Sequence, residues 1–113
     1  MRRALLVVLT CGMMVAPKAK ADFYSGNRLL EICQSREASF REGMCWGFVI
    51  GVADAMSGRD AAVGGWRACL PTPVTVAQVT DIAKRYLQRY PERRHYPAAN
   101  LVAAALAEAF PCG

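Results

Sequence analysis

Hydrophobic residues recur at steps of three and four positions in four segments of the chain, which is the period of an amphipathic helix. The third segment follows Thr75, which fits a capping box with Gln78, and ends at Pro91. No segment alternates with period two for long enough to predict a strand. The sequence therefore predicts an all-α fold, a small bundle of about four helices at residues 25–35, 40–56, 76–90 and 97–111.

The second of these segments shows the longest apolar stripe and an unusual pair of glycines. Gly47 and Gly51 lie four positions apart, on one side of the expected helix. Glycine in a helix interior costs about 1 kcal/mol, so two glycines predict a close crossing with another helix. The stripe that we expect to face the core consists of Phe40, Met44, Cys45, Phe48, Val52 and Met56.

The first 21 residues have the layout of a secretory signal peptide. Arg2 and Arg3 form a positive start, residues 4–16 are nearly all apolar, and residues 19–21 read Ala-Lys-Ala. The apolar stretch is too short to span a bilayer. We expect cleavage before Asp22, which leaves a single helical domain at residues 22–113.

Three other interpretations of this start remain open from the sequence alone. A retained anchor and a mitochondrial-type presequence are two of them, although the arginines cluster at the start instead of repeating. The third is a lipoprotein acylated on Cys11, behind a very short apolar stretch.

Removal of the signal changes the charge of the protein. The full chain has 14 basic and 9 acidic residues, a net charge of +5. Four of the basic residues and none of the acids fall in residues 1–21, which leaves 10 against 9 in the rest. A net charge of +1 gives no support for a nucleic-acid partner, and after cleavage we expect no membrane association.

The domain at residues 22–113 contains four cysteines, Cys33, Cys45, Cys69 and Cys112. An even number of cysteines in a small exported chain predicts disulfides, and four allow three connectivities. Spacing and the expected helices favour Cys33–Cys45 and Cys69–Cys112, because each pair would lie at the end of a helical hairpin. A zinc site is the competing use, but the chain has no C-x-x-C pair, and we expect no metal.

Residues able to do chemistry are few. His95 is the only histidine, in a turn between two expected helices, and Asp54 is the one acid in an otherwise apolar helical stretch. We interpret both as structural or solvated. Phosphate loops, metal-ligating histidine pairs and haem attachment motifs are absent from the sequence, so we expect neither a cofactor nor an enzyme.

Two segments are candidate partner-binding surfaces. The loop at residues 58–67 ends in Trp and Arg, residue types that are enriched at interface hot spots, although the Trp could equally pack on a small core. The turn at residues 92–96 combines basic and aromatic residues, which could instead complement a helix dipole and extend the core. The candidate residues are Arg59, Asp60, Trp66, Arg67, Arg93, Arg94, His95 and Tyr96.

Four stretches, taken in order, resemble the Rap/Tai immunity proteins of type VI secretion systems. CWGFVIGVAD at residues 45–54 is similar to the family's C-x-G-[YF]-I-x-G-x-x-D helix. Its C-[IL]-P and V-T-x-x-Q motifs match residues 69–79, and its Y-L and [HY]-P-E motifs match residues 86–92. The F-P-C ending matches residues 110–112, so that the resemblance covers about Gly26 to Cys112.

The resemblance implies a small periplasmic, disulfide-stabilised helical protein that is often a homodimer. Characterised relatives bind and block peptidoglycan amidase effectors, so we expect steric inhibition by a loop or helix end in the amidase cleft. The matching residues are mainly structural, and no toxin-contacting residue is carried over to this chain. A periplasmic chaperone or stress protein, and an accessory envelope protein without a toxin partner, remain as alternatives.

Overall fold

The computed structural model describes residues 12, 23–35 and 38–113. The predicted signal peptide lies outside the described residues except for Gly12, and so does Cys11. Four α-helices and a short 3-10 helix follow one another, and the described residues form no β-strand beyond isolated bridges. The all-α prediction is confirmed. The elements are α1 (Gly26–Gln34), α2 (Ala38–Ala55), α3 (Val76–Arg89), η1 (Pro91–Arg93) and α4 (Ala98–Ala109).

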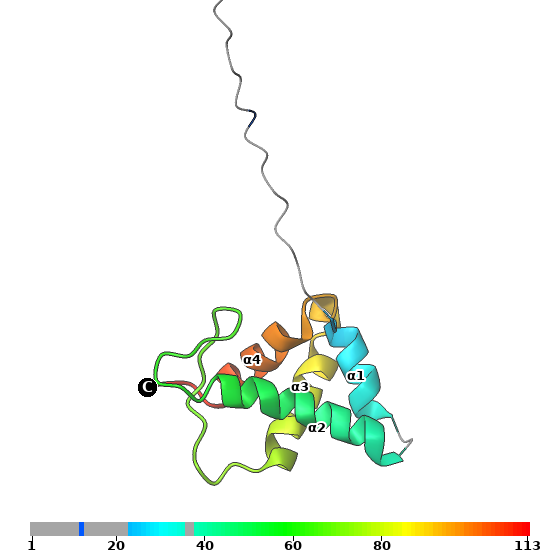
Figure 1. The fold of residues 1–113 in the computed structure, drawn as a ribbon, viewed down its shortest axis with the longest axis horizontal. Coiled ribbons are helices and arrows are strands. Elements are labelled where there is room, and N and C mark those ends of the chain that lie inside the picture. The colour runs from blue at the N-terminus through cyan, green and yellow to red at the C-terminus, as the bar shows by residue number, and fades with distance from the viewer. Residues whose placement is uncertain (1–11, 13–22, 36–37) are drawn as a thin grey trace, which may run out of the picture.

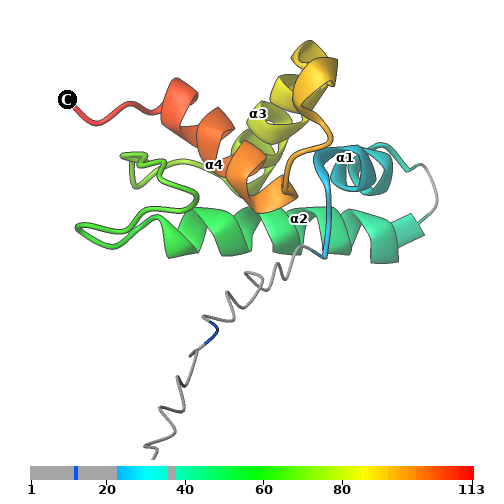
Figure 2. The same cartoon turned by 90° about the horizontal axis from the view of Figure 1, so that it is seen from above.

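The longest helix, α2, lies along one side of the other three. Figure 2 shows α1, α3 and α4 gathered on the same side of α2, and Figure 1 shows α2 crossing in front of α3. The most extensively buried helix is α4, whose residues 101–106 are all buried. Its alanines allow the neighbouring helices to approach closely, because they add little side-chain volume. The largest fully buried side chains are Leu29, Val49, Met56, Leu87, Val102 and Leu106.

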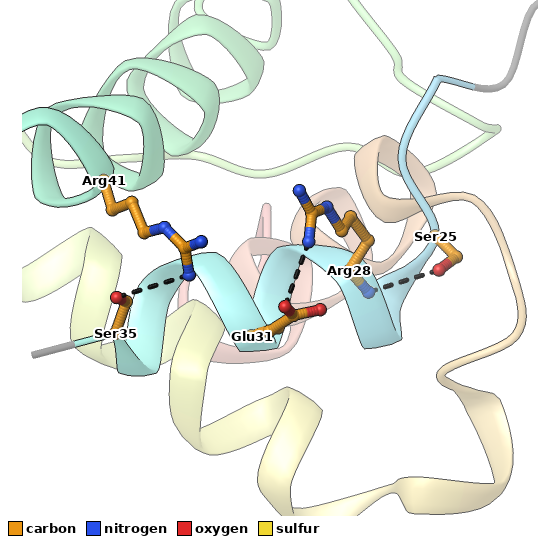
Figure 3. Close-up of polar contacts among 5 residues, drawn as sticks. All are labelled: Ser25, Arg28, Glu31, Ser35 and Arg41. Carbon is orange, nitrogen blue, oxygen red and sulfur yellow. Dashed lines mark hydrogen bonds and ion pairs between the residues drawn. The ribbon is translucent and has the colours of Figure 1, made fainter. Parts of the chain in front are cut away.

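Polar contacts along α1 fix its two ends. The Ser25 Oγ accepts a hydrogen bond from the Arg28 N–H at 3.2 Å, which caps the helix (Figure 3). Arg28 also pairs with Glu31 at 3.0 Å, one turn further on. At the other end, Arg41 of α2 donates to the Ser35 Oγ at 3.4 Å. Of these contacts, the Arg41–Ser35 hydrogen bond is the one that joins the end of α1 to α2.

The predicted capping box at the start of α3 is confirmed. The Thr75 Oγ1 accepts from the Gln78 N–H at 3.2 Å, and the Gln78 Oε1 accepts from the Thr75 N–H at 2.8 Å. The last helix differs slightly from its prediction, since Pro97 is its N-cap and Ala98 its first helical residue.

The described residues contain two disulfides, with the pairing that the spacing favours. Cys33–Cys45 joins the end of α1 to α2, and Cys69–Cys112 joins the α2–α3 loop to the C-terminal segment; each has a Cα–Cα distance of 5.0 Å. The first bond is largely buried, whereas both cysteines of the second are exposed. Restriction of the unfolded chain stabilises the fold by about 3 kcal/mol for the short loop and about 4 kcal/mol for the long one.

The prediction of a close helix crossing at Gly47 and Gly51 is wrong. Both glycines are exposed, and a Cβ built on either would meet no atom within 4 Å. Phe40 was expected in the core, but its side chain is 77% exposed. The physical reason is that Cys45, Val49 and Val52 form the buried side of α2, which the buried Met56 follows directly, and this side lies away from the glycines.

Candidate partner-binding site

A glycine turn shapes the tip of the loop between α2 and α3. Val63 and Trp66 exchange two backbone hydrogen bonds of 3.1 and 2.9 Å across Gly64 and Gly65. The two glycines have φ angles of 57° and 83°, which side-chain-bearing residues rarely adopt. A Cβ on Gly64 would also lie 2.6 Å from the Asn100 Cγ. The loop tip therefore lies against α4, and the turn fixes the backbone position of Trp66.

The turn between α3 and α4 is tied to the start of α1. The N–H groups of Gly26 and Asn27 donate to the carbonyls of Tyr96 and Arg94 at 3.0 and 2.9 Å. These are the first N–H groups of a helix, which have no partner within the helix. A Cβ on Gly26 would lie 3.0 Å from the Arg94 Cα, so this contact requires a glycine. The turn is thus held by an element more than sixty positions away in the sequence.

The loop tip and the turn together enclose a hollow of about 380 Å³, which we call the Trp66–Arg93 hollow. Trp66 and Tyr96 form part of its walls while remaining 48% and 51% exposed, respectively. The buried Leu101 and Ala104 of α4 also line it. The complete lining is Trp66, Tyr86, Arg93, Tyr96, Pro97, Asn100, Leu101 and Ala104.

Arg93 is the charged residue of this lining, and two tyrosines hold its side chain. Its Nη1 donates a hydrogen bond of 2.9 Å to the Tyr86 hydroxyl. Its guanidinium also lies 4.0 Å from the centre of the Tyr90 ring, in a cation–π contact. The hydrogen bond to Tyr86 raises the pKa of Arg93 above its usual value, so that the side chain stays cationic. A fixed, permanently charged donor therefore lies beside exposed aromatic rings.

The structure separates Arg59, Asp60 and Arg67 from this hollow. The Arg67 Nη2 donates to the Arg59 carbonyl at 2.7 Å and lies 3.9 Å from an Asp60 carboxylate oxygen. Arg59 and Arg67 line a different hollow, which also includes Cys69 and Cys112. These three candidates form a local polar cluster at the base of the loop.

The remaining candidates, Arg94 and His95, lie beside the hollow without lining it. Arg94 is half-buried and contributes its carbonyl to the contact with α1. His95 is exposed, and its ring centre lies 4.2 Å from that of Tyr96. Of the eight candidates, Trp66, Arg93 and Tyr96 are the ones that line the Trp66–Arg93 hollow.

Sequence reasoning missed the part of the hollow that the helices supply. Tyr86 of α3 is buried in the core, and its hydroxyl also holds Arg93. Asn100 and Ala104 carried no signal of their own, because only the packing of α4 beside α3 places them under the loop. The tyrosines at positions 86 and 90, followed by a basic turn, were the one available clue.

Two kinds of feature are missing from the part of the chain that the structure describes. In those residues, no three His, Cys, Asp or Glu side chains come together in a way that could hold a metal ion. None of the helices formed there has the length and apolar character needed to cross a membrane. The Trp66–Arg93 hollow is suited to binding, through its aromatic rings and a cation that donates hydrogen bonds.

Two comparisons with known proteins bear on this chain. No curated protein matches the chain. A family of immunity proteins does match, over residues 25–112, which includes all four helices, both disulfides and the Trp66–Arg93 hollow. The chain belongs to the family of Rap1a immunity proteins.

Proposed function

We propose that this chain is a periplasmic immunity protein that binds a peptidoglycan amidase effector and blocks its active site. Membership of the immunity family supports a secreted effector as the protein partner. The amidase activity of that effector is our extension, based on the resemblance of the motifs to Rap/Tai proteins. Two disulfides in so small a chain support an oxidising compartment such as the periplasm.

The observation that carries the proposal is the Trp66–Arg93 hollow. Trp, Tyr and Arg are the residue types that contribute most to protein–protein affinity, and here all three line one exposed hollow. The backbone that presents them is already fixed by the glycine turn and by the hydrogen bonds to α1. A partner would therefore bind without the entropic cost of ordering these segments.

Inhibition by this surface would be steric. An amidase must admit a peptidoglycan strand to its cleft, and a bound protein covering about 800 Å² would exclude so large a substrate. The loop tip at residues 63–66 and the turn at residues 91–97 are the two segments that would lie at the mouth of the cleft. No proton or group transfer by this chain is needed.

An inhibition assay tests the proposal. The chain from residue 22 onward, with its disulfides formed, is mixed with each amidase effector encoded in the same genome, and the release of peptidoglycan fragments is followed. We expect complete inhibition of one amidase at a one-to-one ratio. Unchanged cleavage by every amidase at excess chain would reject the proposed function.

Export and oligomeric state need separate measurements. We propose that cleavage leaves Asp22 as the first residue, and N-terminal sequencing of the periplasmic protein would test this. A homodimer, which the Rap/Tai resemblance implies, stays a prediction for sedimentation analysis. The inhibition assay does not depend on either result.

A further inference from the structure

The Trp66–Arg93 hollow has a definite charge preference. Among the described residues that line it, Arg93 carries a positive charge and none carries a negative one. The surrounding sequence strengthens this bias, since residues 84–96 contain five basic residues and one acid. The rest of the domain compensates, because residues 22–113 have a net charge of only +1. Of these five basic residues, Arg93 is the one that lines the hollow, so the charge preference of the hollow rests on Arg93.

Of the cations in and beside the hollow, Arg93 is the one that lines it. Arg89, one turn earlier, is paired with Glu108 of α4 at 2.9 Å. Arg93 has an acid nearby, Glu92, but the Nε–Oε1 distance is 3.9 Å and the Glu92 side chain is 64% exposed. Such a pair contributes little and gives way easily to a better acceptor.

The geometry of Arg93 suits a carboxylate. A guanidinium has five N–H donors, and the hydrogen bond to Tyr86 uses one nitrogen of the fork. The ring of Tyr90 holds the guanidinium plane, so that little side-chain entropy is lost when a second acceptor binds. The apolar surfaces of Trp66 and Leu101 lie on the same hollow. The hollow is therefore suited to bind an apolar side chain that lies next to a carboxylate.

We propose that the Trp66–Arg93 hollow recognises an acidic segment of the protein partner, in which an apolar side chain enters the hollow and a neighbouring Asp or Glu carboxylate accepts hydrogen bonds from Arg93. This rests on the proposed function, since the segment is assigned to the effector. It goes further by naming the chemistry of the contact and the residue that selects it.

The test uses two blocked peptides, acetyl-Leu-Glu-Leu-amide and acetyl-Leu-Gln-Leu-amide, titrated into the 15N-labelled chain. The peptides have nearly the same shape and differ in charge. We expect the Arg93 Nε–H and Trp66 indole N–H signals to move, with at least about fivefold tighter binding of the Glu peptide. The Trp46 indole, on the outer side of α2, is an internal control and should not move.

Variants separate a specific contact from general charge. Arg93→Gln should abolish the preference for the Glu peptide, and Arg93→Lys should restore part of it, because a lysine keeps the charge but loses the fork. Arg85→Gln is the matched control, since it removes a positive charge from α3 at a residue outside the hollow lining. Unchanged melting temperatures would show that the variants are folded.

Equal binding of the two peptides, no shift with either, or the same loss in Arg85→Gln as in Arg93→Gln would overturn this inference. These outcomes are independent of the inhibition assay. If an amidase is inhibited equally well by the wild-type chain and by Arg93→Gln, the proposed function stands and the acidic-segment inference is wrong. If no amidase is inhibited, the proposed function fails whatever the peptides show.

Discussion

Two regions of this protein expose a tryptophan, and they differ in how the fold supports it. In α2, Trp46 is 42% exposed and lies between the exposed Gly43 and Gly47, on what we call the outer side of this helix. In the Trp66–Arg93 hollow, Trp66 is 48% exposed, but three separate chain segments hold its surroundings. The exposed fractions of the two tryptophans are thus nearly equal, and the difference lies in the chain segments that surround them. An exposed aromatic residue points to a binding site when the fold fixes its neighbours.

The largest effect that we expect concerns the disulfide next to the loop. Replacing Cys69 and Cys112 by Ser should lower the free energy of unfolding by about 4 kcal/mol, against about 3 kcal/mol for the Cys33 and Cys45 double variant, because the closed loop is longer. Urea denaturation of the two variants measures the difference. The Cys69 and Cys112 variant should also loosen the Trp66–Arg93 hollow. A larger loss of unfolding free energy in the Cys33 and Cys45 variant would contradict this account.

A smaller effect, on partner affinity instead of stability, separates the two tryptophans. Trp66→Ala should weaken binding of the inhibited amidase by about 2 kcal/mol, roughly thirtyfold, as is usual for a hot-spot tryptophan. Trp46→Ala should change the affinity less than about twofold. Calorimetry on both variants makes the comparison. Equal losses would remove the distinction between the two regions.

The last pair of effects, which includes the smallest one, concerns the glycines, and here the two regions should respond with opposite signs. Gly64→Ala should destabilise the fold by about 1–3 kcal/mol, because its φ angle is positive and the new Cβ would meet Asn100. Gly47→Ala should instead stabilise it by about 0.5–1 kcal/mol, since the new methyl group meets nothing and glycine is a poor helix former. Thermal or urea unfolding of both variants provides the measurement. Destabilisation by Gly47→Ala would revive the close helix crossing that the structure contradicts.

These cases show which parts of the molecule the sequence predicts. The helices follow from local periodicity, and the Thr75 capping box follows from residues three positions apart. Disulfide pairing was favoured because the cysteines flank predicted hairpins. The side of α2 that faces the core was misjudged around Phe40 and Gly47, because a helix that is apolar on most sides has no clear polar face.

The Trp66–Arg93 hollow could be predicted only in pieces. Trp66 and Arg93 were each candidates, but they are 27 positions apart and belong to different connections. Their meeting depends on how α3 packs against α4 and on the contact of Gly64 with Asn100. Such long-range packing leaves no periodic signal in the sequence.

The central claim is that the partner covers Trp66 and leaves Trp46 exposed. Hydroxyl-radical footprinting of the chain, alone and in complex with the amidase that it inhibits, measures the oxidation of each tryptophan separately. We predict that complex formation strongly reduces the oxidation of Trp66 and leaves that of Trp46 unchanged. Protection of Trp46 with continued oxidation of Trp66 would contradict the account and move the partner-binding surface to the outer side of α2.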